Sequence, residues 1–339
     1  MPLDRKIMLD VSFIIPFYNG ELTIKRCLDS IYSIGIEESR FEIVIVDDCS
    51  PVAAQSVLAD YLTRHANIRV IRHEQNKRQG GAKNTGIKAA MGEYIAFADQ
   101  DDYVISDNQK RAIERALSTR PDMLACKWLL KHEDGNTTVC GLDLPDGLTD
   151  DGKTYCETWF DAVKCLAPWS YLYKRDFLIK TAHPMAENVM MEDADWVAWH
   201  LFYAPKVEFM NLPIYCWVMN PNSITHSFSW RHKADWVKYG YRKIKDSALM
   251  SISSPRFGAI MKSDGKHNIE NVFRKLWNTD DYSRFYQHVG GEVLKELQTM
   301  EWSKKTAFML RHPSIVCACL SIIGPVLKSI REFKKNNKN

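Results

Sequence analysis

Apolar and polar positions alternate along the first 130 residues in blocks that predict strands and helices in turn. Continuous β-branched runs at 11–16 and 41–48 are typical of strands buried on both faces of a sheet. Apolar runs at 68–73 and 93–99 predict two more strands. The segments between them carry apolar residues at near-helical spacing and predict helices over 20–33, 51–66 and 82–91. This alternation predicts an α/β fold with a doubly wound, mostly parallel sheet flanked by helices.

The alternation weakens after about residue 135. Ordered structure is expected to resume at 165–178 and 188–204, the second of which looks helical. The run 206–220 predicts one or two strands interrupted by Pro213. We therefore expect a catalytic domain over 1–230 and a mainly helical C-terminal region over 231–339.

The net charge is informative only when it is counted separately for the C-terminal tail and for the rest of the chain. The whole sequence has a formal net charge of +3, but 328–339 alone contain five Lys or Arg and one Glu. The rest is close to neutral, which argues against nucleic acid as a partner because phosphate backbones require distributed basic side chains. Nine cysteines without a C-x-x-C pair indicate free thiols in a reducing compartment.

The N-terminal segment MPLDRKIMLD lacks the apolar run of a secretory signal, and no stretch reaches the roughly 18 apolar residues of a spanning helix. These features predict a cytoplasmic protein. The segment 313–339 joins an apolar stretch to a basic end, which predicts peripheral association with the inner face of the cell membrane. A core helix followed by a solvated basic tail is the alternative.

Two acidic segments follow predicted strands. Asp99, Asp101 and Asp102 come directly after the fourth strand, and Asp47 and Asp48 end the second. Because ligands bind beyond the carboxyl ends of parallel strands, these acids are expected to share one edge of the sheet. Carboxylate oxygens suit Mg²⁺ or Mn²⁺, which often share their coordination with substrate phosphates. A solvated acidic loop is the alternative.

The other polar motifs each have two interpretations. Asp48 is suited to accept hydrogen bonds from a nucleoside, but Asp48 or Ser50 is equally suited to cap the next helix. The glycine-rich segment 76–86, with its basic residues, predicts either a phosphate-binding turn entering a helix or a flexible surface loop. It is neither G-x-G-x-x-G nor a Walker A sequence. The acids in 190–196 lie beside Met and Trp, which suits a general base with a raised pKa, although helical surface acids are the simpler interpretation.

Taken together, six segments resemble family 2 glycosyltransferases, inverting enzymes with the nucleotide-sugar-binding GT-A fold. They occur in the family's order between residues 11 and about 228: VSFIIPFYNGE, EIVIVDDCS, NKRQGGAKNTGIKAAMGEYIAFADQDD, APWSYLYKRDFL, MEDADW and PIYCWVMNPNSIT. The family commonly has Arg at the position of Lys83, so a phosphate-binding role for that residue is put in doubt.

The resemblance implies specific roles. Asp193 matches the catalytic base, with Glu192 beside it, and Asp99 and Asp101 match the D-x-D pair that holds Mn²⁺ or Mg²⁺ on the donor diphosphate. His226 falls where the family sometimes supplies a further metal contact, and Trp169 lies where it shapes the sugar and acceptor region. The donor-binding residues would be Pro16, Phe17, Tyr18, Asp47, Asp48, Arg78, Lys83, Asp99 and Gln100.

By this resemblance the chain would transfer a sugar from a nucleotide-diphospho-sugar, expected to be a UDP-sugar, to a glycan or lipid-linked acceptor. The products expected are bacterial surface polysaccharides such as capsule or lipopolysaccharide. One alternative is a non-catalytic nucleotide-sugar-binding or assembly protein. Another is a haloacid-dehalogenase-type phosphatase, but its D-x-D normally follows the first strand and has Thr or Val where this chain has Tyr103.

Overall fold

The computed structural model describes residues 9–159, 166–220, 229–276, 279 and 281–320. The chain forms two compact units, residues 1–220 and 221–339. Each unit is described by itself.

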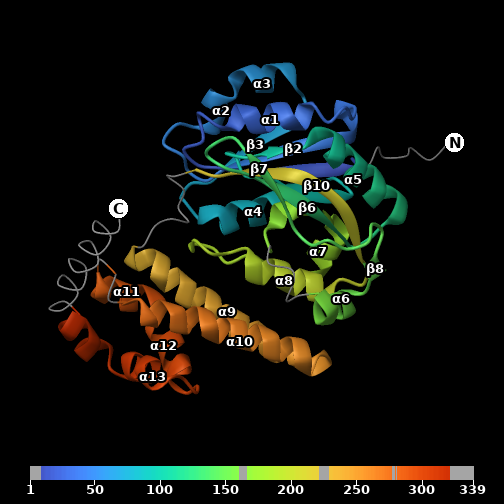
Figure 1. Ribbon diagram of the computed structural model, residues 1–339. Helices are drawn as coiled ribbons and strands as arrows, with labels where there is room; N and C mark the ends of the chain where they lie inside the picture. The colour runs from blue at the N-terminus through green and yellow to red at the C-terminus, as the bar shows by residue number, and fades with distance from the viewer. Residues whose placement is uncertain (1–8, 160–165, 221–228, 277–278, 280, 321–339) are drawn as a thin grey trace. The chain divides into compact units, whose positions relative to one another are not determined.

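The N-terminal unit is built on a mixed sheet (Figure 1). Its first half is parallel, in the order β3-β2-β1-β4, which confirms the four predicted strands. These strands are β1 (Val11–Phe17), β2 (Phe41–Asp47), β3 (Ile68–Arg72) and β4 (Tyr94–Phe97). Every residue of β1, β2 and β4 is buried, as expected for strands covered on both faces.

The second half of the sheet is where antiparallel pairs enter. β9 (Tyr171–Lys174) lies between β4 and β6 (Met123–Lys131) and is antiparallel to both. β10 (Val207–Val218) runs parallel to β6 as one strand, with register shifts on either side of Pro213. Three short edge strands pair antiparallel with β6 or β10: β5 (Tyr103–Val104), β7 (Thr137–Cys140) and β8 (Thr149–Asp150).

Helices cover both faces of this sheet, with α1 to α3 on one side and α4 on the other (Figure 1). Their bounds differ from the predictions, and α1 begins at Ile24, later than the expected residue 20. The predicted helix 51–66 is broken at Leu58, the helix expected from 188 begins at Ala194, and the helix expected from 82 begins at Arg78. The helices are α1 (Ile24–Tyr32), α2 (Ala54–Val57), α3 (Ala59–Arg64), α4 (Arg78–Ala89), α5 (Ser106–Thr119), α6 (Gly152–Trp159), α7 (Arg175–Thr181) and α8 (Ala194–Tyr203).

Glycines allow α4 to pack closely on its neighbours, so the segment is not a flexible loop. A Cβ on Gly80 would lie 2.1 Å from the carbonyl oxygen of Ala186, and one on Gly86 would lie 2.3 Å from the Ile14 side chain. Backbone and strand side chains occupy the space that any larger residue would need. The glycines of 76–86 are therefore explained by helix packing as well as by any phosphate binding.

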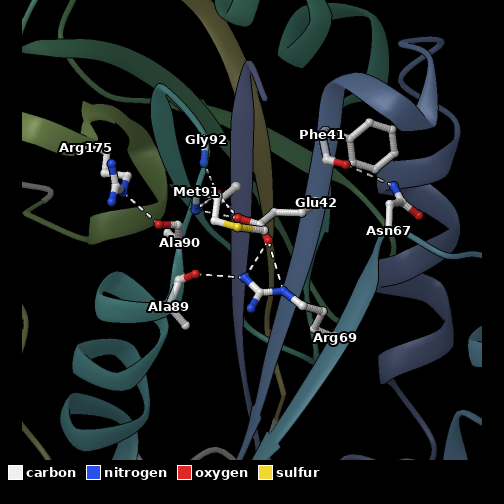
Figure 2. Close-up of polar contacts among 10 residues, drawn as sticks. Phe41, Glu42, Asn67, Arg69, Ala89, Ala90, Met91, Gly92 and Arg175 are labelled. Carbon is white, nitrogen blue, oxygen red and sulfur yellow. Dashed lines mark hydrogen bonds and ion pairs between the residues drawn. The ribbon is translucent and has the colours of Figure 1, made fainter. Parts of the chain in front are cut away.

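A buried carboxylate at the start of β2 fixes the turn between α4 and β4 (Figure 2). Glu42 is 2% exposed, and its Oε1 accepts hydrogen bonds from Ser12 Oγ and Met91 N at 2.6 Å each. Its Oε2 accepts from Arg69 Nε at 3.1 Å and Nη2 at 2.6 Å. Gly92 N donates to Ser12 Oγ at 2.8 Å and completes the network. The carboxylate of Glu42 thus accepts four hydrogen bonds through its two oxygens.

We expect Glu42→Gln to lower the free energy of unfolding by about 3 kcal/mol, because the amide nitrogen cannot accept a hydrogen bond and Arg69 loses its charged partner. Urea denaturation measures the change. The same substitution at Glu38, whose contact with His65 is exposed, is the matched control and should cost less than about 1 kcal/mol. Equal effects at the two positions would contradict this interpretation.

The C-terminal unit is mainly helical, as predicted. Its two long helices α9 and α10 approach closely where Gly240 faces Gly265: a Cβ on either would lie 2.5 or 2.6 Å from the other's carbonyl oxygen. Ser254 caps α10 through the Phe257 amide, and Pro255 occupies its first turn. The helices are α9 (Trp230–Ser253), α10 (Pro255–Arg274), α11 (Tyr282–Val289), α12 (Gly291–Gln298) and α13 (Lys304–Arg311).

Within the described residues, no helix combines the length and the apolar character needed to cross a bilayer. The basic end of the chain, from residue 321, lies outside the described residues. Membrane association through this tail stays a prediction.

Candidate active site

The turns that follow β1 and β4 are joined by one side chain. Gln100 Oε1 accepts a hydrogen bond from Tyr18 N at 3.0 Å, and its Nε2 donates to Tyr18 O at 2.7 Å. Both polar groups of the amide are therefore used within the protein. Pro16 and Phe17 are buried in β1, whereas Tyr18 is 42% exposed and is the member of this trio that presents its side chain to solvent.

The two aspartates at the end of β2 make different contacts. Asp47 is fully buried; its Oδ1 accepts from Ser50 N at 2.8 Å, its Oδ2 accepts from Ala54 N at 2.9 Å, and it also pairs with Arg72. This aspartate satisfies the backbone amides at the start of α2. The capping role that the sequence offered to Asp48 or Ser50 is therefore taken by Asp47, whose carboxylate is committed to the protein.

Asp48 contacts the turn before α4 and a histidine after β3. Its Oδ1 accepts from Lys77 N at 2.8 Å and lies 2.8 Å from His73 Nδ1. Among the described residues no hydrogen bond reaches its Oδ2. Arg78 begins α4 with a φ of 66°, and its amide donates to Asn76 Oδ1 at 3.2 Å. The 76–78 turn is thus shaped locally and tied to the end of β2 through Asp48.

A buried cation links acids that are almost 100 residues apart in sequence. Lys83, on α4, is 1% exposed, and its Nζ lies 3.0 Å from Glu192 Oε1 and 3.4 Å from Gln79 Oε1. The same Nζ is 3.9 Å from Asp99 Oδ1. Lys83 therefore neutralises carboxylates from two motifs and does not lie on the surface as a phosphate-binding side chain would.

Burial and charge act in opposite directions in this group. Burial alone would lower the pKa of Lys83, but the carboxylates of Glu192, Asp99 and Asp193 outweigh it and raise that pKa above its usual range. Burial raises the pKa of Glu192 to about 7, against the opposing effect of Lys83. The pKa values of Asp99 and Asp193 are also raised, chiefly by burial. Lys83 thus stays protonated, while the acids around it hold protons more tightly than free carboxyl groups.

Asp193 stands at the N-terminus of α8 and is its N-cap residue. Its Oδ1 accepts from Ala194 N at 2.8 Å, while Glu192 precedes the helix and is 3% exposed. The interpretation of the acids in 190–196 as helical surface residues is therefore wrong: Glu192 and Asp193 precede the helix, and Asp195 in its first turn is buried, as is Glu192. Among the described residues no hydrogen bond reaches Asp193 Oδ2, which leaves one carboxylate oxygen free to take a proton.

Asp102 has a role that the sequence did not specify. Tyr215 Oη donates to its Oδ2 at 2.9 Å, and Val218 N donates to its Oδ1 at 2.8 Å. The same Tyr215 Oη accepts from Asp99 N at 2.9 Å. Trp169 stacks on the Tyr215 ring with centroids 4.6 Å apart and an interplanar angle of 12°. Tyr215, on β10, thus holds the backbone amide of Asp99 in place. Asp102 accepts from the Tyr215 hydroxyl, and Trp169 packs on the Tyr215 ring.

The acids after β4 have the chemistry of a divalent-cation site. Asp99 Oδ1 is buried and receives no hydrogen bond from the described residues, and Lys83 Nζ, 3.9 Å away, is too distant to donate one. A buried carboxylate oxygen without a hydrogen bond is costly, and a closer cation would offset that cost. Asp101 is partly exposed. The described residues contain no cluster of three or more His, Cys, Asp or Glu side chains suited to a metal. His226, the third predicted ligand, lies outside the described residues.

Sequence comparison agrees with this geometry. Residues 12–159 match the family model described as glycosyl transferase family 2. A Bacillus subtilis protein named uncharacterized glycosyltransferase EpsJ is 34% identical over 223 residues, which cover 63% of this chain and 62% of EpsJ. Poly(ribitol-phosphate) beta-N-acetylglucosaminyltransferase TarS of Staphylococcus aureus is 32% identical over 121 residues, 35% of this chain and 21% of TarS. The chain thus spans less than two thirds of these relatives.

Structural comparison extends the likeness over nearly the whole chain. Residues 1–349 of S. aureus TarS in complex with UDP-GlcNAc align with a TM-score of 0.59 at 18% identity, covering 95% of this chain and 91% of that one. At this identity the match shows the fold alone, which is the GT-A type. Residues 12–159 therefore match glycosyl transferase family 2, and the fold is that of the solved glycosyltransferases.

Proposed function

We propose that this chain is an inverting glycosyltransferase that moves a sugar from a nucleotide-diphospho-sugar to a hydroxyl group of a glycan or lipid-linked acceptor. The observation that carries the proposal is the contact of Lys83 with both Asp99 and Glu192. It joins the acids suited to a donor diphosphate and its cation to the acids suited to proton removal. A transferase requires both functions side by side.

In this proposal Asp193 takes the proton from the acceptor hydroxyl as the hydroxyl oxygen attacks the anomeric carbon. The bond to the diphosphate breaks on the opposite face of the sugar, so configuration inverts and no covalent enzyme intermediate forms. Asp193 is suited to this role because its raised pKa favours proton uptake and its Oδ2 is unpaired among the described residues. Glu192 is committed to Lys83 and acts by positioning.

Asp99 and Asp101 would hold Mn²⁺ or Mg²⁺, which stabilises the charge that develops on the leaving diphosphate. Asp48 would accept hydrogen bonds from the nucleoside through Oδ2. The exposed ring of Tyr18 and the basic 76–78 turn would lie along the donor, and Trp169 would support the sugar region through Tyr215. Pro16, Phe17 and Asp47 shape the site from within the fold.

The printed names of the relatives suggest the substrate class. TarS was solved with UDP-GlcNAc, and a Pyrobaculum calidifontis mannosyltransferase with a TM-score of 0.50 and 13% identity was solved with GDP-Man and Mn²⁺. A Bacillus spizizenii relative, 39% identical over 100 residues, is a poly(ribitol-phosphate) beta-glucosyltransferase. These names favour a UDP-sugar donor and bacterial polysaccharide or teichoic acid synthesis.

A donor panel tests the proposal. The protein is incubated with Mn²⁺ and each of several UDP- and GDP-sugars, and both thermal stabilisation and release of the nucleoside diphosphate are followed. We expect one donor to raise the melting temperature and to be consumed. Binding without any consumption, with acceptor glycans present, would instead favour a non-catalytic nucleotide-sugar-binding protein. No binding to any donor would overturn the proposal.

We expect Asp101→Ala to weaken Mn²⁺-dependent binding of UDP at least about tenfold, because it removes a proposed metal ligand while leaving the fold intact. Isothermal titration calorimetry at fixed Mn²⁺ measures the affinity. Asp107→Ala, at an exposed position in the first turn of α5, is the matched control and should bind as the unmodified protein does. Unchanged affinity in the Asp101 variant would remove that residue from the metal site.

A further inference from the structure

A histidine at the end of β3 connects two elements of the candidate site. His73 Nδ1 lies 2.8 Å from Asp48 Oδ1, and its Nε2 lies 2.8 Å from Thr85 Oγ1 on α4. The imidazole is 8% exposed, so water competes little for these contacts. The same topological rule that selected the acids after the other strands applies to this residue, which directly follows β3.

The chemistry of Asp48 determines which ring nitrogen of His73 donates a hydrogen bond to it. An ionised carboxylate can only accept hydrogen bonds, so the proton between the ring and Asp48 lies on Nδ1. Thr85 Oγ1 engages Nε2 and prevents the ring from turning about its Cβ–Cγ bond. Because both ring nitrogens are used, the imidazole fixes one orientation of the Asp48 carboxylate.

In that orientation the two carboxylate oxygens of Asp48 differ in their hydrogen bonding. Oδ1 takes both the His73 contact and the Lys77 amide, while Oδ2 receives no hydrogen bond from the described residues. A carboxylate fixed at one oxygen offers the other as a preset acceptor for hydroxyl or N–H donors. The shared Oδ1 also ties this acceptor to the basic 76–78 turn, through the Lys77 amide.

We propose that His73 is a positioning residue for the nucleoside of the donor: with Thr85 it holds Asp48 so that Oδ2 accepts from that nucleoside. This inference rests on the proposed function and assigns to His73 and Thr85 a role within it. His73 itself does not touch the donor. Its loss should therefore raise the donor KM and the dissociation constant of UDP, while kcat at saturating donor changes less.

Two substitutions test the contacts of the two ring nitrogens of His73 one at a time. In Asn the side-chain nitrogen is as many bonds from Cα as Nδ1 of His, whereas in Gln it is as many bonds away as Nε2. His73→Asn therefore keeps a donor for Asp48, and His73→Gln keeps only the end that faces Thr85. His65→Gln is the matched control, since His65 Nδ1 makes a 2.8 Å contact with Glu38 in the same unit.

Calorimetric titration of the full chain with UDP and Mn²⁺ gives the test, with donor KM and kcat measured in parallel. We expect His73→Gln to weaken UDP binding about tenfold, the loss of one hydrogen bond to a charged group. His73→Asn should remain within about threefold of the unmodified protein, and His65→Gln should equal it.

Equal UDP affinity in His73→Gln and the unmodified protein would overturn the inference and leave the proposed function standing. Equally weak binding by His73→Asn and His73→Gln would also overturn it, because the ring would then act by filling space. An unmodified protein that binds no nucleoside diphosphate would overturn the proposed function, and this inference with it.

Discussion

Asp193→Asn is expected to lower kcat for transfer about 1000-fold and to leave UDP affinity within twofold of the unmodified value. The amide cannot take a proton from the acceptor, and general-base removal typically costs two to four orders of magnitude. The fold should be unaffected, because Asp193 is the N-cap of α8 and Asn caps helices as well as Asp does. Initial rates of transfer with saturating donor and calorimetric UDP titration give the two quantities.

A matched substitution separates capping from catalysis. Asp281 caps α11 by accepting from Arg284 N at 2.9 Å and has no part in the proposed chemistry. Asp281→Asn should therefore retain full activity. If Asp193→Asn kept a tenth or more of the unmodified kcat, Asp193 would not be the base, and the unpaired carboxylate oxygen would need another explanation.

Lys83→Met should have the largest effect on stability. It removes the cation that contacts both Glu192 and Asp99 and leaves their buried carboxylates uncompensated. Breaking a buried ion pair from one side typically costs about 3–5 kcal/mol, and we expect a loss in that range at pH 7. Urea denaturation measures it, and transfer activity should fall at least 100-fold because the acids of both motifs lose their common support.

The double variant Lys83→Met with Glu192→Gln tests whether the loss is electrostatic. If it is, removing the partner charge should restore a large part of the lost stability, as a double-mutant cycle would show. Lys83→Arg keeps the charge and should lose less than Lys83→Met. A Lys83→Met protein within about 1 kcal/mol of the unmodified one would mean that the contact contributes little.

The sequence predicted the first half of the sheet well, because buried parallel strands appear as continuous β-branched runs. It could not predict that β9 would enter between β4 and β6, since that pairing depends on contacts between residues far apart in the chain. It also placed the start of α4 too late. Gly80 and Gly81 disfavour a helix locally, but the close approach of Ala186 and of the Lys77 side chain requires residues without a Cβ there.

The site was predicted at the level of residues but not of their partners. The rule about strand ends selected Asp48 and Asp99, and would also have selected His73. The sequence could not show that Asp47, and not Asp48, accepts from the backbone amides at the start of α2. Which of two adjacent aspartates faces α2 depends on where β2 ends in the folded sheet. Nor does any local pattern indicate that Lys83 is buried against Glu192, over a separation of 109 residues.

The amide of Gln100, bonded on both sides to the backbone of Tyr18, has a consequence for the kinetics of donor binding. It holds the turn that bears Asp99 and Asp101 in place before any ligand arrives. A donor that meets an already ordered turn does not have to supply the conformational entropy of arranging it, so more of its interaction energy remains as affinity. Association should then proceed in a single diffusional step without a slow closing phase.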